Sequence, residues 1–170
     1  DKAAATVTLE RLGLPQPRTT IVPDRAALAA MTAFPTFLKL PIGPASGGVG
    51  LVSSAAEVEQ LVERWDLDAA FAIGGLVAQA PADGPLAMVQ AVFDHGSLVG
   101  FHANLRVREG VRGGASHKRS VSAPEARAAI ERLGHELGWH GALSADVILT
   151  SDGPVFIDLN PRLVEPSNAA

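Results

Sequence analysis

Residues 144–162, which read SADVILTSDGPVFIDLNPR, decide the fold of this chain. Two apolar segments, 142–150 and 154–159, flank the turn-forming residues Ser151-Asp152-Gly153. This pattern is typical of two antiparallel strands joined by a tight turn. The segment therefore predicts a β-hairpin near the end of the chain.

The length of the turn decides which residues of this hairpin face each other. A three-residue loop Ser151–Gly153 favours a left-handed glycine at its end. It predicts that residue 150 pairs with 154, 148 with 156, and 146 with 158. Asp146 and Asp158 would then share one face of the sheet with Asn160. A two-residue turn would shift the register and place the two carboxylates on opposite faces.

Asp146, Asp158 and Asn160 form the candidate metal site. Two carboxylates and an amide oxygen are hard ligands that suit one or two Mg²⁺ ions, with Mn²⁺ as an alternative. Facing carboxylates repel each other without a cation, so the pairing indicates a bound metal. The competing interpretation is a solvated acidic hairpin on a structural α+β domain that binds no nucleotide.

With Arg162 just beyond, this segment resembles the C-terminal signature of the ATP-grasp superfamily, which includes biotin carboxylases, carbamoyl-phosphate synthetases and carboxylate–amine ligases. The resemblance implies an α+β fold of two lobes with the nucleotide held between them. It implies that Asp146, Asp158 and Asn160 hold Mg²⁺, and that Arg162 is catalytic and stabilises charge on the phosphoryl group. The family more often has glutamate at position 158, which bridges two metals more readily than the shorter aspartate.

The stretch FPTFLKLPIGPASGGVGLV, residues 34–52, is the candidate phosphate site. Lys39 is the only charge in an apolar strand, and a buried ammonium needs an anionic partner such as phosphate. Glycines let backbone amides approach a polyphosphate closely. The alternative is an edge-strand lysine beside a surface hairpin. The resemblance to ATP-grasp proteins implies that Lys39, Gly47 and Gly48 contact the phosphates.

Two further segments extend the resemblance. Lys2, in the opening Asp-Lys pair, would reach the α-phosphate region, and its alternative is a solvated terminal lysine. Residues 76–84, LVAQAPADG, resemble the hinge strand that recognises adenine. Gln79 and Gly84 match that strand, whereas Ala80 replaces the usual glutamate. The hinge residues implied to bind the cofactor are Gln79, Pro81 and Asp83.

A basic segment, GVRGGASHKRS at residues 110–120, is expected to form a polar loop. In related ligases a basic loop here meets the γ-phosphate or the substrate carboxylate, which makes Lys118 and Arg119 candidate catalytic residues beside His117. The alternative is a solvated surface loop. Arg106 is a candidate anion contact or a member of a surface ion pair.

The remaining histidines predict no site. The segment HELGWH, residues 135–140, spaces its histidines by five positions, so they do not share a helical face as zinc ligands do. Gly138 is expected to end the helix. His95 and His102 are interpreted as ordinary turn and strand residues.

Helices and strands alternate along the rest of the chain, which favours an α+β fold. Helices are expected at 1–12, 25–32 and 124–137, and another, with apolar positions Val58, Leu61 and Val62, is expected to run to Trp65. Further strands are expected at 19–23, 34–40, 50–52, 75–80, 87–94 and 98–107. We expect a smaller lobe over about 18–82 and a larger lobe over about 83–170, preceded in a longer protein by an amino-terminal domain.

The composition restricts the partners. The chain has 170 residues, of which 47% are hydrophobic and 19% charged, as in an ordinary globular protein. A net charge of −4 without a basic stripe argues against nucleic-acid binding. No apolar run is long enough to predict a membrane span. The absence of cysteine excludes disulfides and thiolate chemistry and fits the cytoplasm.

The expected function is an ATP- and Mg²⁺-dependent ligase that activates a small carboxylate as an acyl phosphate for attack by an amine or another nucleophile. The other expected partner is the rest of a longer chain, and an oligomer is open. Two alternatives remain: a nucleotide-binding module without turnover, to which Ala80 and Asp158 point, and a biotin-carboxylase-like carboxylation.

Overall fold

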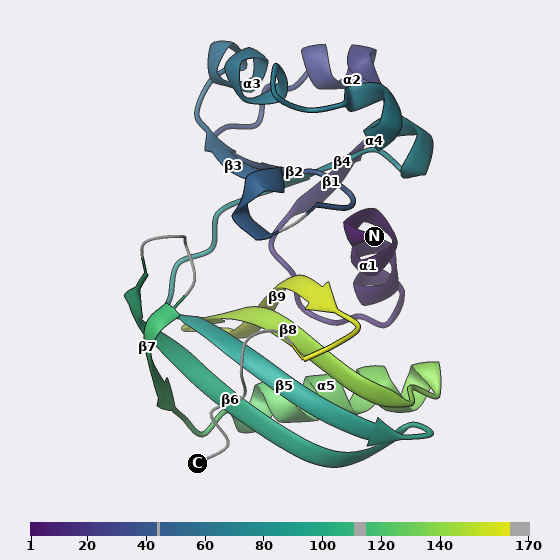
Figure 1. The fold of residues 1–170 in the computed structure, drawn as a ribbon, viewed down its shortest axis with the longest axis vertical. Helices are drawn as coiled ribbons and strands as arrows, with labels where there is room; N and C mark the ends of the chain where they lie inside the picture. The colour runs from purple at the N-terminus through teal and green to yellow at the C-terminus, as the bar shows by residue number, and fades with distance from the viewer. Residues whose placement is uncertain (44, 111–114, 164–170) are drawn as a thin grey trace. The chain divides into compact units, whose positions relative to one another are not determined.

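The computed structural model describes residues 1–43, 45–110 and 115–163, with the backbone only for residues 45 and 46. The chain divides into two compact units. The smaller contains Asp1–Thr8 and Gln16–Pro81, and the larger contains Leu9–Pro15 and Ala82–Ala170. Each unit is built on one antiparallel sheet (Figure 1). The α+β class expected from the sequence is confirmed.

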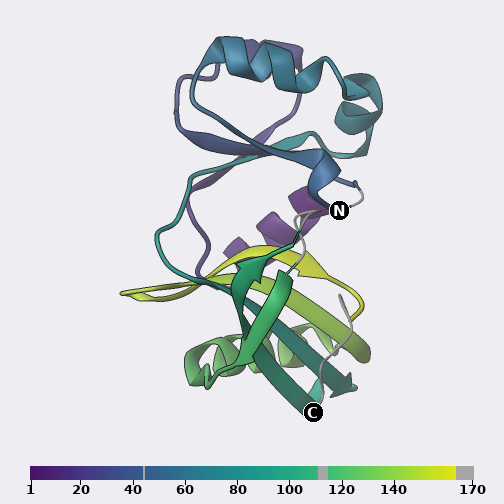
Figure 2. The ribbon, with the colours of Figure 1, turned by 60° about the vertical axis from the view of Figure 1, so that its left-hand side comes forward.

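The smaller unit has a four-stranded sheet. Its strands, in spatial order, are β1 (Thr19–Val22), β4 (Leu76–Gln79), β2 (Thr36–Lys39) and β3 (Val49–Val52). The helices α2 (Arg25–Ala29), α3 (Ala55–Val62) and α4 (Leu67–Ile73) lie on one face of this sheet (Figures 1 and 2). Their apolar side chains pack against Leu38, Val52 and Leu76 of the strands to form the core of this unit.

A side chain caps the N-terminus of each of the three helices that cover this sheet. Asp24 accepts the Ala27 N–H at 2.8 Å and Asp66 accepts the Ala69 N–H at 3.1 Å. Ser54 caps α3 in the same way. Such caps satisfy backbone donors that have no partner within the helix. The helix α4 is not among the sequence predictions, although Asp66 before an apolar segment is its signal.

The larger unit has a five-stranded sheet with one long helix on it. The strands, in spatial order, are β7 (Ala115–Ser120), β6 (Ser97–Glu109), β5 (Leu86–Asp94), β8 (Gly141–Thr150) and β9 (Gly153–Asn160). The helix α5 (Pro124–Leu137) covers one face of the sheet (Figure 1). The sequence predicts a loop where the structure has the strand β7. The loop prediction is wrong because the composition of β7 is polar and gives no sign of its pairing with β6.

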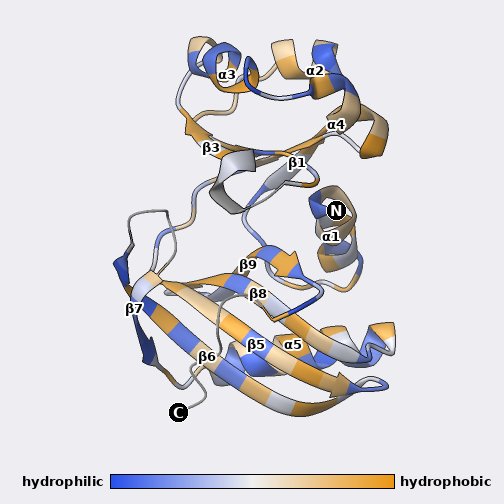
Figure 3. Cartoon of the chain, viewed as in Figure 1, coloured by the Kyte–Doolittle hydropathy of each residue, from blue (hydrophilic) through white to orange (hydrophobic). Residues whose placement is uncertain are grey.

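The face of this sheet beneath α5 is apolar and closely packed. Val89, Val147 and Phe156 point to it and are fully buried with Ile130 of the helix. A Cβ at Gly134 would lie 2.0 Å from the Phe93 ring, so the glycine lets the helix approach the sheet. Alternate residues of the same strands point to the other face, and the resulting mixture of hydrophilic and hydrophobic positions is visible in Figure 3.

Two further elements complete the described chain, the helix α1 (Lys2–Arg11) and the short 3₁₀ helix η1 (Ala45–Gly48). Among the helices of the described residues, none has the length and apolar character required to cross a membrane.

Candidate functional site

The hairpin formed by β8 and β9 closes with a shorter turn than predicted. Thr150 pairs with Gly153, so the turn contains only Ser151 and Asp152. The Thr150 hydroxyl donates to the Gly153 carbonyl at 2.7 Å and accepts the Asp152 N–H at 3.2 Å, which stabilises the tight turn. The predicted three-residue loop, with 150 paired to 154 and 148 to 156, is therefore wrong.

A β-bulge restores the pairing of the two carboxylates. Val147 pairs with Phe156, whereas Asp146 pairs with Asp158, so Ile157 is the extra residue. Without this bulge, the two-residue turn would place Asp146 and Asp158 on opposite faces of the sheet. The two aspartates face each other as expected, but by a different route from the one predicted.

Two rows of side chains, all polar except Met88, lie on the sheet face opposite α5. Paired residues share a face, so a chain of pairs defines each row. One row crosses all five strands and consists of Asp158, Asp146, Met88, Asn104 and Ser120. The adjacent row consists of Asn160, Ser144, Gln90 and His102. Asp146, Asp158 and Asn160 thus lie at one end of an extended polar face.

The middle of this face is buried, although its residues are polar. Ser144, Asn104 and Gln90 are 1%, 3% and 4% exposed. His102 lies 3.0 Å from the Ser120 hydroxyl and 3.4 Å from the Asn104 amide. Buried polar groups are retained when they are hydrogen-bonded. The sequence does not predict a site role for these residues, although lone polar side chains in apolar strands are the available signal.

The candidate metal ligands fit Mg²⁺ in their chemistry. Asp146, Asp158 and Asn160 are each half-buried and offer only oxygen ligands. The Arg162 guanidinium donates to the Asn160 amide oxygen at 3.2 Å. The Ser144 hydroxyl donates to the Arg162 carbonyl at 2.5 Å, so the buried row fixes the backbone at this arginine. The structure therefore brings Arg162 beside Asn160, one of the three candidate ligands.

The candidate basic residues lie on two different faces. Lys118 pairs with Arg106, and strand alternation from the Asn104–Ser120 pair places both on the polar face. Arg119 pairs with Leu105 and points to the other face, so it does not share the face of Lys118. The Arg106 Nε is buried and has no hydrogen-bond partner among the described residues. A buried N–H without an acceptor costs about 1–3 kcal/mol, which an anionic ligand would recover.

The smaller unit brings together two residues that come from different predicted segments. Lys39 and Gln79 are 6% and 4% exposed, and the Lys39 ammonium donates to the Gln79 side-chain oxygen at 2.7 Å. The Gln79 amide in turn donates to the Thr19 hydroxyl at 3.1 Å. Leu38, directly before Lys39, and Ala78, directly before Gln79, point into the helix-covered core. Lys39 and Gln79 therefore lie on the opposite face of the sheet.

Backbone hydrogen bonds connect the residues that follow Lys39 to the glycine-rich segment and to the start of the chain. The Leu40 N–H donates to the Gly48 carbonyl, and the Lys2 N–H donates to the Pro41 carbonyl, both at 2.8 Å. A Cβ at Gly47 would meet nothing within 4 Å. The packing of the described residues therefore does not require glycine at position 47.

The hinge segment has exposed residues followed by a required glycine. Pro81 and Asp83 are both exposed. Gly84 has a φ of +145°, and a Cβ there would lie 2.3 Å from the Leu149 carbonyl oxygen. Glycine at position 84 is thus needed for the chain to pass this close to β8.

Comparison with known proteins identifies similar folds but no close relative. No family model matches the chain, and no curated protein matches it. The biotin carboxylase domain of 2-oxoglutarate carboxylase from Hydrogenobacter thermophilus, solved with MgADP, ADP and bicarbonate, superposes with a TM-score of 0.77 and 20% identity over 96% of this chain and 40% of that chain. Phosphoribosylamine–glycine ligase from Thermotoga maritima has a TM-score of 0.71 and 19% identity over 96% of this chain and 47% of its own.

A third similar structure is the L-amino acid ligase from Bacillus licheniformis. Its TM-score is 0.68 and its identity 21%, over 95% of this chain and 42% of that chain. This chain thus spans less than half the length of each of these three proteins. The similarity extends over nearly all of this chain, and these proteins share one architecture. The chain has the ATP-grasp fold.

Proposed function

We propose that this chain binds ATP with Mg²⁺ and takes part in an ATP-dependent ligation, in which a carboxylate is activated as an acyl phosphate and then attacked by an amine or another nucleophile. The observation that carries the proposal is the pairing of Asp146 with Asp158, with Asn160 on the same face of an ATP-grasp sheet. Facing carboxylates in a sheet favour a bound cation. The three side chains would hold Mg²⁺, which binds phosphate oxygens and neutralises their charge.

Basic side chains would stabilise the negative charge of the phosphates. Lys39 is held in place by Gln79, so it needs little reorganisation to meet a phosphate oxygen. Arg162, fixed through Ser144, would stabilise the phosphoryl group during transfer. Lys118 and Arg106 would meet the carboxylate substrate or the γ-phosphate. Arg119 points to the other face of the sheet and has no role in this proposal.

The remaining contacts would position the nucleotide. Lys2 would reach the α-phosphate region, and the backbone of Gly47 and Gly48 would approach the phosphates. Adenine recognition would use the backbone of the hinge, because the Gln79 side chain is engaged with Lys39 and Thr19. The hinge residues are Gln79, Pro81 and Asp83.

Two alternatives have specific support. Biotin carboxylases from Hydrogenobacter thermophilus and Campylobacter jejuni are among the similar structures, which favours a carboxylation in which bicarbonate is the activated acid. A nucleotide-binding module without turnover is favoured by Ala80 at the position where the family usually has glutamate.

Thermal melting with ATP, with and without Mg²⁺, tests nucleotide and metal binding. Ligand at about 100 times its Kd adds roughly 2.7 kcal/mol of stability, which corresponds to a Tm increase of about 5–10 °C for a domain of this size. We expect this increase to require Mg²⁺ and to be lost in Asp158→Asn. Asp152→Asn is the matched control, because Asp152 is an exposed carboxylate in the turn of the same hairpin. An equal increase in both variants would contradict the metal assignment.

Release of ADP separates a ligase from a binding module. The protein is incubated with MgATP and a panel of carboxylates, bicarbonate included. ADP release that depends on one carboxylate and is lost in Arg162→Ala supports the ligase. Bicarbonate as the effective acid would favour the carboxylation. Binding without ADP release under any of these conditions would favour the module without turnover.

A further inference from the structure

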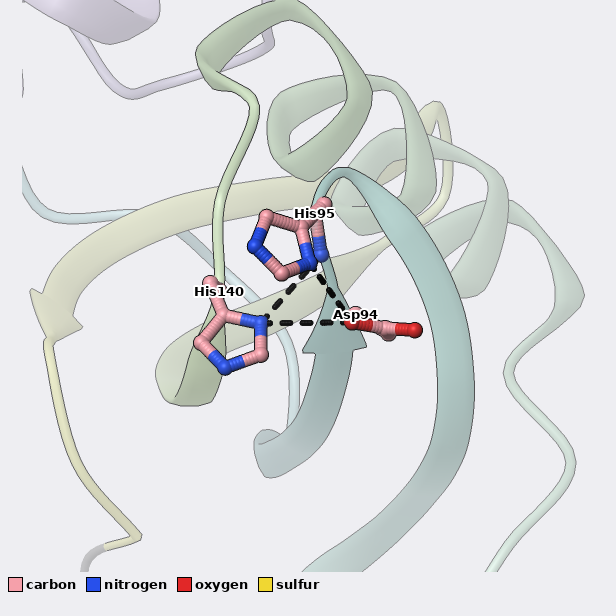
Figure 4. Close-up of side chains that lie close together, drawn as sticks. All are labelled: Asp94, His95 and His140. Carbon is pink, nitrogen blue, oxygen red and sulfur yellow. Dashed lines mark hydrogen bonds and ion pairs between the residues drawn. The ribbon is translucent and has the colours of Figure 1, made fainter.

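A second group of polar side chains lies at the turn between β5 and β6, apart from the Asp146–Asp158 pair. Asp94 is the last residue of β5, His95 lies in the turn, and His140 comes from the segment between α5 and β8 (Figure 4). All three side chains are exposed, and one ligating atom from each lies within 4.8 Å of the other two. Both imidazole rings present a nitrogen to the same carboxylate oxygen, His95 Nδ1 at 2.7 Å and His140 Nδ1 at 3.4 Å.

An uncommon backbone conformation places the first histidine in this group. Asp94 pairs with Ser97, so His95 and Gly96 form a two-residue turn. Their φ angles are +44° and +88°, as in a type I′ turn, whose first position is usually asparagine, aspartate or glycine. His95 is the one non-glycine residue with a positive φ in the described part of the chain. Such an outlier at a polar cluster motivates a functional hypothesis.

Backbone interactions hold the second histidine beside this turn. The helix α5 ends at Leu137, and Gly138 follows with a φ of +57° in the left-handed conformation. The Gly96 N–H donates to the Trp139 carbonyl at 2.7 Å. This bond joins the turn to the residue directly before His140. The imidazoles of His95 and His140 lie with their centroids 4.3 Å apart.

We propose that Asp94, His95 and His140 bind one divalent transition-metal ion, of which Zn²⁺ is the representative. Two imidazoles and one carboxylate suit such ions, and solvent would complete the coordination of an exposed site. Bonds of about 2.0–2.1 Å in a tetrahedral site separate ligand atoms by about 3.3–3.4 Å. The carboxylate oxygen and His140 Nδ1 are already 3.4 Å apart. The 2.7 Å contact with His95 would lengthen as the metal replaces the shared proton.

This site differs chemically from the one assigned to Mg²⁺. The ligands at Asp146, Asp158 and Asn160 are all oxygens, whereas two of the three ligands here are nitrogens. Mg²⁺ prefers oxygen, and imidazole favours the transition metals. An ion pair that needs no metal would show the same contacts, and metal titration distinguishes the two.

Calorimetric titration of ZnCl₂ into the full chain tests this proposal. We expect one ion to bind through this cluster, with its Kd raised at least about ten-fold in each of Asp94→Asn, His95→Asn and His140→Asn. Asparagine is favoured in a type I′ turn, so His95→Asn removes the ligand and retains the turn. His117→Asn is the matched control, since His117 lies on β7 outside the cluster. Excess Mg²⁺ is expected not to displace the ion.

Imidazole resonances in NMR spectra supply a second readout that needs no variant. Zn²⁺ is expected to shift the ring nitrogens of His95 and His140 and to leave those of His117 unchanged. Binding weaker than about 1 mM would overturn the proposal. The proposal would also be overturned if each of the three cluster variants still bound Zn²⁺ as tightly as the unmodified chain. Loss of Zn²⁺ binding in Asp158→Asn together with its retention in His140→Asn would overturn it as well.

Discussion

The two faces of the five-stranded sheet are built from alternate residues of the same strands, and both are buried at their centres. Val89 and Phe156 fill the face beneath α5, whereas Gln90, Asn104 and Ser144 occupy the other. An apolar side chain is stabilised by burial itself, but a buried polar side chain needs a partner for each of its groups. The first face thus determines stability, and the second holds polar groups in fixed positions, as a binding site requires.

The largest effect expected from this comparison is on the apolar face. Phe156→Ala removes a fully buried ring beneath α5 and should lower the free energy of unfolding by about 3–5 kcal/mol. Urea unfolding followed by circular dichroism measures this loss. Val155→Ala is the control, because Val155 precedes Phe156 on β9 and is only half-buried. Losses of equal size in the two variants would remove the distinction between the faces.

A smaller effect is expected from the buried polar row. Ser144→Ala removes the hydroxyl that donates to the Arg162 carbonyl, and should lower the free energy of unfolding by about 1 kcal/mol. Ser97→Ala, at an exposed position of β6, should change it by less than about 0.5 kcal/mol. Urea unfolding of both variants is the measurement. If Ser144 positions Arg162, the variant also loses ADP release beyond what its stability explains.

Substitution in the Asp146–Asp158 pair should raise the free energy of unfolding rather than lower it. Asp158→Asn removes a negative charge opposite Asp146 and should stabilise the metal-free chain by roughly 0.2–1 kcal/mol at low ionic strength. Salt screens charges, so the gain should shrink in 1 M NaCl. Thermal melts at two salt concentrations measure both quantities, with Asp152→Asn as the control. Destabilisation by Asp158→Asn without Mg²⁺ would show that the pair is not repulsive.

Sequence reasoning predicted the elements whose signals are local. Asp24 before an apolar segment marks the start of α2, and Gly138 marks the end of α5. The sequence predicts the pairing of Asp146 with Asp158, but from a three-residue loop, whereas the structure has a two-residue turn and a bulge. The Thr150 hydroxyl is hydrogen-bonded within the two-residue turn, and the bulge at Ile157 directly follows Phe156, which packs beneath α5. Tertiary packing of this kind leaves no short-range pattern in the sequence.

The contacts that the sequence does not predict are those between residues at distant positions. Lys39 and Gln79 were predicted for separate roles, and their hydrogen bond joins residues 40 positions apart. From the sequence, His95 is an ordinary turn residue, and His140 belongs to a pair of histidines whose spacing does not suit a zinc helix. They are 45 positions apart and meet because the Gly96–Trp139 hydrogen bond joins two turns. Spacing along the chain could not show this.

The smallest expected effect is a change in the titration of Asp94, at the turn beyond both faces. The hydrogen bond and the charge of His95 lower the pKa of Asp94 from its ordinary value of 3.8. An aspartate with a lowered pKa contributes stability above its ordinary pKa, and this contribution is lost as the pH falls through the folded value. His95→Asn should therefore move the pKa of Asp94 up toward 3.8, as measured by carboxyl ¹³C NMR between pH 2 and 6. His117→Asn should leave the titration of Asp94 unchanged. An unchanged pKa in His95→Asn would mean that the His95–Asp94 contact does not form in solution, and the geometry proposed for the transition-metal site would lose its basis.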